Sequence, residues 1–200
     1  MLDMGKDNDK KLSLAIDYLE YLGTTDKKIE ELKAEWYKLG CNFSVSSGSE
    51  RCYVSIDGLD KNFEQAMKLM EEVLANVKAD NDAYEGLLSI IFQGRANSLK
   101  DKNKILRGLL ARAQYGEDSR FTNNFSNEEL MAIDPEELTS IIRDILNYKH
   151  KIFYYGPREM ADVEKVIKEN HNVSGEYKDY PEAKEYVERD FDNPQVLFVN

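Results

Sequence analysis

Apolar residues recur along the chain at a spacing that predicts helices for most of its length. The first apolar stripe lies on one face of a helix and consists of Leu12, Ala15, Ile16, Leu19 and Leu22. Gly23 and Gly40 directly follow two such stripes, and glycine is the usual residue just beyond the C-terminal end of a helix. The pattern predicts helices over residues 8–22, 27–39, 61–77, 81–99, 102–115, 135–147 and 159–170.

Three local features refine this helical prediction. The segment 81–99 is apolar around much of its circumference, and a helix of that kind is expected near the centre of a fold. Ser126 and Glu129 form a capping box, which predicts a short helix after residue 126. Asp134 followed by Pro135 predicts another helix start, because proline is favoured at the first helical position.

Strict alternation of apolar and polar residues predicts a β-hairpin between residues 41 and 56. Its inward side consists of Cys41, Phe43, Val45, Cys52, Val54 and Ile56. A turn at residues 47–50 would place Cys52 opposite Val45. The two cysteines are then too far apart for a disulfide, whose Cα atoms lie within about 7 Å, so both are expected to be free thiols in the core.

The other side of the hairpin is polar without being charged, and it consists of Asn42, Ser44, Ser46, Tyr53 and Ser55. Protein surfaces usually carry a large share of charged side chains. An uncharged polar face therefore suits contact with a peptide or a partner. An ordinary exposed face of small residues is the alternative, and the pattern leaves both open.

The order of these elements predicts an α+β two-layer sandwich, a small antiparallel sheet with several helices packed on one face. Further strands are expected over residues 151–155 and 195–199. The length suits a single domain over residues 1–200. Both ends interrupt regular elements, so we expect a fragment of a longer chain, in which residues 176–200 lead into the next domain.

Composition narrows the range of partners. Lys and Arg total 27 against 38 Asp and Glu, a formal net charge of −11. Such a surface repels phosphate backbones and anionic lipids, so neither a nucleic acid nor a membrane is an expected partner. No apolar run approaches the roughly 18 residues of a membrane span, and no signal peptide is visible. The compartment stays open, with the periplasm as one alternative if a signal peptide lies outside this stretch.

Candidate chemistry is sparse and concentrates on the first helix. The chain has no Gly-rich nucleotide motif, and its two histidines, His150 and His171, suit structural roles. Asp17, Glu20 and Tyr21 share one helix face in the order D-x-x-E-Y. With histidine at the first and last of these positions the motif would read H-x-x-E-H, in which two histidines hold zinc and the glutamate activates water.

Several segments, taken in order, resemble the pitrilysin/insulinase family of zinc metallopeptidases. They are residues 17–24 (DYLEYLGT), residues 39–53, residues 115–122 and residues 153–157 (FYYGP). The match runs from about Met4 to the end of the chain. In the family, as this resemblance implies, two similar halves close around a peptide, and usually only the first half holds zinc.

The departures from the family pattern imply a degenerate motif. Asp17 and Tyr21 stand where the family has its zinc-binding histidines, and Glu20 alone keeps the family residue. The third ligand is a glutamate on a later helix, but this chain has none between Glu85 and Glu117. The resemblance therefore implies no catalytic residue, no metal and no cofactor here, with zinc confined to a catalytic half elsewhere.

The implied role is that of the first domain of the inactive half. It would form a chamber wall and a structural support for the catalytic zinc-bearing domain, on the same parent chain or on a separate subunit. The peptide substrate would lie against the uncharged hairpin face, and Arg95 and Arg112 are candidate partners for the carboxylates of the first helix. The alternatives are a pure assembly module, as in the respiratory core proteins, and a peptidase with an unconventional site.

Overall fold

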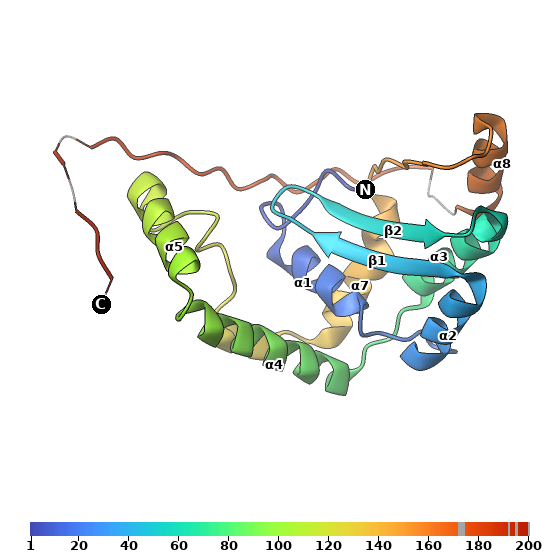
Figure 1. Cartoon of the computed structure of the whole chain (residues 1–200), viewed down its shortest axis with the longest axis horizontal. Helices are drawn as coiled ribbons and strands as arrows, with labels where there is room; N and C mark the ends of the chain where they lie inside the picture. The colour runs from blue at the N-terminus through green and yellow to red at the C-terminus, as the bar shows by residue number, and fades with distance from the viewer. Residues whose placement is uncertain (172–174, 192, 195, 200) are drawn as a thin grey trace.

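Helices pack against one face of an antiparallel hairpin in the computed structural model, which describes residues 1–171, 175–191, 193–194 and 196–199 (Figure 1). This confirms the α+β prediction. The elements are α1 (Lys10–Leu19), α2 (Ile29–Leu39), β1 (Cys41–Ser47), β2 (Cys52–Gly58), α3 (Phe63–Asn76), α4 (Asn81–Ser98), α5 (Lys102–Tyr115), α6 (Asn127–Ala132), α7 (Pro135–Asp144) and α8 (Met160–Asn170), with short 3₁₀ turns at Asp60–Asn62 and Ile145–Asn147.

Helix α1 is shorter at both ends than its apolar stripe predicts. It begins after Asp9, whose side chain accepts a hydrogen bond from the backbone N–H of Lys11 at 2.8 Å. Beyond Leu19 the chain tightens, because the N–H of Tyr21 donates to the carbonyl of Tyr18 at 3.0 Å, a 3₁₀ spacing. The helix therefore ends before Glu20, and Tyr21 lies in the turn that follows.

The hairpin forms where alternation predicts it, but the predicted register was wrong. Cys52 pairs with Ser47, not with Val45, and Cys41 pairs with Gly58. The turn spans residues 48–51 and is closed by the N–H of Gly48 and the carbonyl of Arg51 at 2.8 Å. A slip of two residues keeps every side chain on its own face, so the alternation alone could not distinguish the registers. Both cysteines are free and buried, as predicted.

The core lies between the inward face of the hairpin and helices α1, α3 and α7. Among its fully buried side chains are Leu12, Ile16, Leu19, Leu138, Ile142 and Ile145. Buried tyrosines join the helices through their hydroxyl groups: Tyr18 donates to the carbonyl of Asp80 at 2.6 Å, and Tyr84 donates to that of Leu130 at 2.7 Å. Trp36 of α2 stacks on Phe43 of β1, which fixes α2 against the hairpin.

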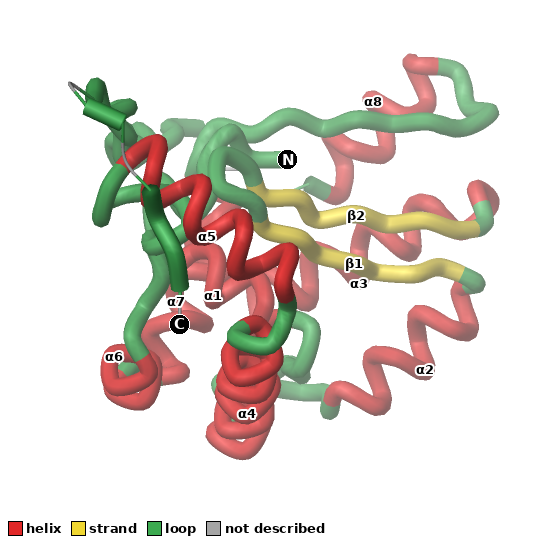
Figure 2. Tube along the Cα trace, turned by 60° about the vertical axis from the view of Figure 1, so that its left-hand side comes forward, coloured by secondary structure: helices red, strands yellow, loops and turns green. Residues whose placement is uncertain are grey.

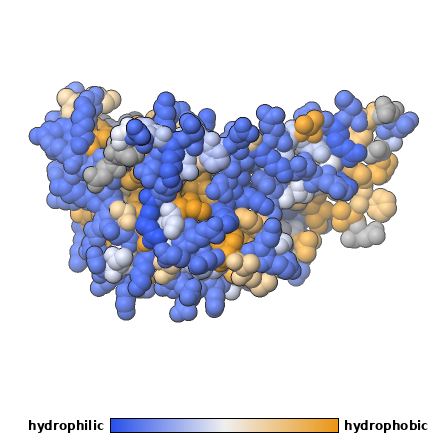
Figure 3. All heavy atoms as spheres, turned by 180° about the vertical axis from the view of Figure 1, so that it is seen from behind, coloured by the Kyte–Doolittle hydropathy of each residue, from blue (hydrophilic) through white to orange (hydrophobic). Residues whose placement is uncertain are grey.

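Helix α4 is peripheral, so the prediction that it lies at the centre was wrong. Only Tyr84, Leu87 and Leu88 are buried in it, and Ile90 is 53% exposed. Within the described residues α5 buries no side chain fully, and both helices stand away from the sheet (Figure 2). The apolar residues around α4 therefore lie partly on the exposed surface and not in the core. Figure 3 shows apolar side chains gathered at the end of the molecule formed by α5 and the C-terminal tail.

The predicted strand over residues 151–155 was also wrong. His150 forms a β-bridge with Leu2, and Lys151 exchanges backbone hydrogen bonds with Met1, but residues 152–155 form no strand. A strand exists only where a neighbour takes its hydrogen bonds. The predicted final strand was wrong over residues 196–199 as well, because these residues are exposed and form no strand.

The tail runs back across the N-terminal segment. The N–H of Lys184 donates to the carbonyl of Asp7 at 2.7 Å, and the amide of Asn8 donates to the carbonyl of Pro181 at 2.8 Å. No helix in the described part of the chain is long and apolar enough to cross a membrane.

Candidate functional site

The C-terminal end of α1 brings two of the three motif positions into electrostatic contact. Asp17 and Glu20 are both exposed, and Tyr21 is 36% exposed. The surrounding protein desolvates the Asp17 carboxyl group and the charge of Glu20 repels it, so the pKa of Asp17 rises to about 6, although Lys6 opposes the change. All three side chains are exposed, although Tyr21 lies in the turn beyond the helix.

The basic side chains near this face have other partners. Arg95 donates to the carbonyl of Phe125 at 2.7 Å and also contacts Asn127, and Arg112 pairs with Glu117 at 2.9 Å. The expectation that these arginines pair with the carboxylates of α1 was therefore wrong. Their hydrogen bonds instead hold the loop before α6 and the end of α5.

The residues at this end of α1 do not fit a zinc ion. Protein zinc sites use about three or four nitrogen, sulfur or oxygen ligands in a tetrahedral arrangement. Two carboxylates one turn apart and a phenol fall short of that set. Among the described residues no group of three or more His, Cys, Asp or Glu side chains is arranged to hold a metal. A carboxyl group with a pKa of about 6 could exchange protons near neutral pH, but none of these contacts supplies a nucleophile beside it.

The uncharged face of the hairpin is exposed as one continuous strip. Ser46 lies opposite Tyr53 and Ser44 lies opposite Ser55, and Asn42 extends the strip toward the end of β1. All five side chains are exposed. The register adds Asp57, which lies opposite Asn42 and is also exposed. One carboxylate therefore joins a face that the alternation described as uncharged.

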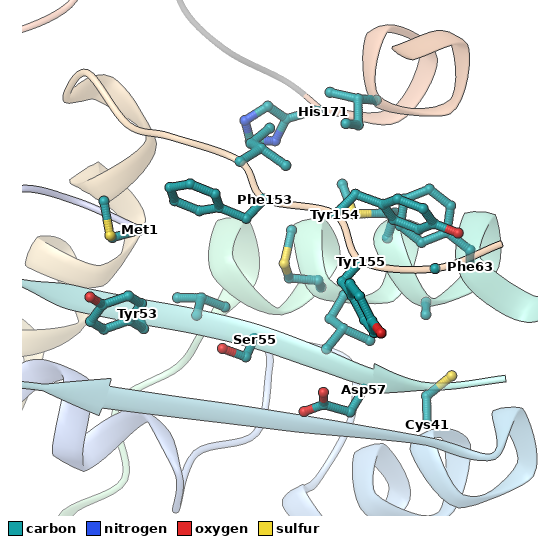
Figure 4. A pocket seen from close by; sticks show the side chains of 18 of the residues that line it. Met1, Cys41, Tyr53, Ser55, Asp57, Phe63, Phe153, Tyr154, Tyr155 and His171 are labelled. Atoms are coloured by element: carbon teal, nitrogen blue, oxygen red, sulfur yellow. The ribbon is translucent and has the colours of Figure 1, made fainter. Parts of the chain in front are cut away.

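A groove that the sequence did not predict lies beside the edge of β2 that faces away from β1. It has a volume of about 620 Å³ and lies between β2, α3 and the extended segment 150–157. In Figure 4, Tyr53, Ser55 and Asp57 come from β2, while Phe153 and Tyr155 come from the opposite segment. Its lining from α3 is apolar and consists of Phe63, Ala66, Met67, Met70 and Leu74.

The far wall of this groove is tied down at its C-terminal end. The guanidinium group of Arg158 and the hydroxyl group of Tyr154 each donate to Asp60 Oδ1 at 2.8 Å. Arg158 also donates to the Asp60 carbonyl at 2.6 Å and lies over the Phe63 ring. The Arg158 hydrogen bond holds the pKa of Asp60 below its ordinary value, with Tyr154 adding to the effect.

Two histidines that the sequence leaves 21 residues apart meet at the other end of the groove. The Nε2 atoms of His150 and His171 are 2.7 Å apart. His150 Nδ1 lies 2.8 Å from the carbonyl of Tyr148, and His171 Nδ1 lies 2.6 Å from Glu71 Oε1. Each of these three contacts needs one hydrogen between its two polar atoms. Desolvation lowers the pKa of His150.

No protein-family model and no curated protein sequence matches the chain. Many solved structures resemble it, including these three. An M16 peptidase inactive domain from Pseudomonas fluorescens has a TM-score of 0.59 and 18% identity over 70% of this chain and 35% of its own. The periplasmic protease PqqL from Escherichia coli has a TM-score of 0.70 and 10% identity, and the match covers 94% of this chain and 21% of the PqqL chain. The ferredoxin protease FusC, solved with Arabidopsis ferredoxin, has a TM-score of 0.68 and 12% identity, and the match covers 92% of this chain and 21% of the FusC chain.

These likenesses define the fold of the chain as α+β. More particularly, the chain shares the fold of M16 peptidase domains, and one of these domains is described as inactive. This agrees with the resemblance to the pitrilysin/insulinase peptidases. The chain spans 35%, 21% and 21% of these three solved chains.

Proposed function

We propose that this chain is a non-catalytic domain of a larger M16-type zinc peptidase, where it forms part of the chamber wall and contacts the peptide substrate. In this proposal residues 1–200 are one domain, and its partners are the other domains of the parent chain or a separate catalytic subunit. Zinc belongs to that catalytic part. The observation that carries the proposal is the exposed polar strip of the hairpin within a peptidase-like fold.

The chemistry of the strip suits a peptide whose sequence varies. Hydroxyl and amide groups at Asn42, Ser44, Ser46, Tyr53 and Ser55 both donate and accept hydrogen bonds. They bind backbone amides without selecting for charge. Beside them β1 is an edge strand in the described part of the sheet, and an edge strand can pair with an extended peptide through its main chain.

The end of α1 supports a binding role over a chemical one. Asp17 and Tyr21 replace the two histidines that the family motif requires, and the remaining donors do not fit zinc. Glu20 without a metal has no activated water to deprotonate. An exposed pair of carboxylates is suited to contact with polar groups of a peptide or of a neighbouring domain.

A photo-crosslinking experiment tests the proposal. A benzophenone amino acid replaces Ser44 in one variant and Lys33, which is exposed on α2, in a matched control. Each variant is irradiated with a biotinylated casein peptide. We expect labelling at position 44 well above that at position 33, and no cleavage of the peptide with or without added zinc. Equal labelling at both positions would refute substrate contact at the hairpin.

The same assay addresses the remaining alternative of an unconventional peptidase. Cleavage by this chain that survives a chelator would show such a site and would overturn the non-catalytic proposal. The variant Glu20→Gln, which removes the family's general base, distinguishes activity at α1 from a contaminating protease.

A pure assembly role is the second candidate, and a specific surface favours it. The α4–α5 surface has apolar side chains that are about half exposed or more: Ile90 (53%), Leu99 (79%), Leu106 (53%), Leu110 (58%) and Phe121 (49%). Large exposed apolar patches usually mark interaction sites. If assembly is the whole function, position 44 gives no peptide crosslink, while crosslinkers on α5 capture the catalytic part of the parent peptidase.

A further inference from the structure

Basic residues are concentrated in one part of an otherwise acidic chain. Residues 86–116 hold six of the 27 Lys and Arg residues but one of the 38 Asp and Glu residues. Their net charge is therefore +5, whereas the rest of the chain has a net charge of −16. This stretch includes most of α4 and all of α5, the two helices that stand away from the sheet (Figure 2). The charge of this end of the molecule is thus opposite to that of the remainder.

Four exposed basic side chains in or next to α5 pair with no carboxylate in the part of the chain that the structure describes. They are Lys100, Lys102, Lys104 and Arg107. The single acidic residue of the stretch, Asp101, caps the helix and accepts a hydrogen bond from the backbone N–H of Asn103 at 2.9 Å. The four cations are therefore not neutralised within the described chain, and their combined field can attract an acidic partner.

Leucines and cations share the exposed face of α5. Leu106 is 53% exposed and Leu110, one helical turn further on, is 58% exposed. Lys102 precedes Leu106 by four residues and Arg107 precedes Leu110 by three, so each leucine has a cation beside it on the helix surface. Protein interfaces combine an apolar centre with a polar rim and complementary charges. This face therefore matches a surface that is apolar at its centre and acidic around it.

Charge and burial distinguish the possible occupants of this face. A two-fold contact places the same surface on both chains, so a second copy docked through α5 would bring two sets of cations together. The remainder of the chain, with its net charge of −16, repels nucleic acids and anionic lipids. Ile105 and Leu109, which complete the apolar stripe, are partly buried, so the stripe cannot enter a lipid surface as a whole. An acidic protein surface is the occupant that meets none of these obstacles.

We propose that the exposed face of α5 docks an acidic protein surface with an apolar centre, presented by another domain or subunit. Leu106 and Leu110 enter the apolar centre, and the four unpaired cations face the surrounding carboxylates. The inference rests on the assembly role given above as the second candidate function, and it deepens that role by naming the chemistry of the partner. It does not depend on peptide contact at the hairpin.

Fluorescence anisotropy with an acidic helical probe tests this site. The probe is a fluorescein-labelled peptide of leucine and glutamate with its leucines at helical spacing, and the control probe has lysine in place of every glutamate. We expect the acidic probe to bind at least about tenfold more tightly than the basic one. Reversing the charge of both Lys102 and Arg107 to glutamate should weaken its binding by about tenfold, because two attractive contacts become repulsive. Replacing Leu106 and Leu110 by serine should weaken it by a similar factor.

A matched variant separates the local effect from that of net charge. It reverses Lys33 and Lys38, both exposed on α2, to glutamate, and so changes the net charge of the chain by the same amount. We expect this variant to weaken binding of the acidic probe by less than about threefold, because exposed charges beyond the Debye length are screened. An equal loss in both charge-reversed variants would show that net charge alone attracts the probe and would overturn the proposal.

Two further measurements decide against the other occupants. Tighter α5-dependent binding to phosphatidylglycerol vesicles than to the acidic probe would identify a membrane surface and contradict the proposal. A dimer in sedimentation that disappears when Lys102 and Arg107 are reversed would identify a second copy, with the same consequence. The assembly role is tested separately by the crosslinkers on α5: capture of the catalytic part that is unaffected by charge reversal overturns this inference alone, whereas no capture overturns the assembly role itself.

Discussion

Replacing Asp17 by asparagine should stabilise the protein near neutral pH. The folded state raises the pKa of Asp17 from 3.8 to about 6, first by desolvation and then by the repulsion of Glu20. At about 1.4 kcal/mol for each tenfold change in proton affinity, that difference corresponds to an upper bound of about 3 kcal/mol. Because the side chain is exposed, water screens much of this effect, and we expect a gain of about 1 kcal/mol.

The sign of the pH dependence makes this prediction specific. Folded Asp17 holds its proton more tightly than unfolded Asp17, so the wild type loses stability as the pH rises from about 4 through 6 and does not recover it above. The variant has no such group. Its advantage should therefore be absent at pH 4 and complete at pH 7, where about 1 kcal/mol raises Tm by about 2–4 °C for a chain of this size.

Urea denaturation at pH 4 and pH 7 measures this difference. The fluorescence of Trp36 is a suitable signal, because it is the chain's single tryptophan and is 7% exposed. Glu20→Gln should produce a smaller gain with the same pH dependence, since its repulsion is the second contribution. Asp179→Asn, in the exposed tail, is the control and should change little. An Asp17→Asn variant that is no more stable at pH 7, or is equally stabilised at pH 4, would refute the reasoning.

Three further perturbations probe the fold. Tyr84→Phe removes the hydrogen bond to the buried Leu130 carbonyl and should cost about 1–3 kcal/mol of unfolding free energy in chemical denaturation; an unchanged midpoint would contradict it. Asp9→Ala removes the cap on the N–H of Lys11 and should cost about 1 kcal/mol, whereas Asp9→Asn should retain most of the stability. Desolvation lowers the pKa of His150 from 6.5, so stability should fall as the pH drops below about 6.5, and His150→Asn should weaken that dependence.

Features that depend on neighbouring residues in the sequence could be predicted. Ser126 and Glu129 form the capping box that their spacing indicates, and Asp134 caps α7 with Pro135 at its first turn. Gly40 adopts the left-handed conformation, with φ of 58°, that ends α2. In each case the chemistry that decides the structure lies within a few residues, so the sequence contains all of it.

Features that depend on distant neighbours could not be predicted. Apolar residues around α4 indicate contact with something apolar, but not whether that is the core of this chain or a partner. The strand propensity of residues 151–155 is strong, yet the described structure pairs only the start of this stretch, where Lys151 bonds to Met1. The hairpin register required the turn geometry, which places Gly48 opposite Arg51.

The candidate site likewise has some features that could be predicted from nearby residues and others that depend on distant segments. The outward positions of Asp17, Glu20 and the hairpin strip follow from helical and strand periodicity, which is local. The groove beside β2 and the contact between His150 and His171 follow from how distant segments pack. Each histidine taken alone suits a structural role, and only the structure shows that the two contact each other and that His171 contacts Glu71.

The ties between the first residues and the tail also set an order of folding during synthesis. Met1 bonds to Lys151, Leu2 pairs with His150, and Asp7 is held by Lys184 and Tyr186. Leu2 can pair with Cys52 as soon as the hairpin forms, but its bridge to His150 and the bonds of Asp7 to the tail need residues that are synthesised much later. We therefore expect the contacts of the first residues with residues 150–186 to form late, after the hairpin and helices α1 to α7 have been synthesised.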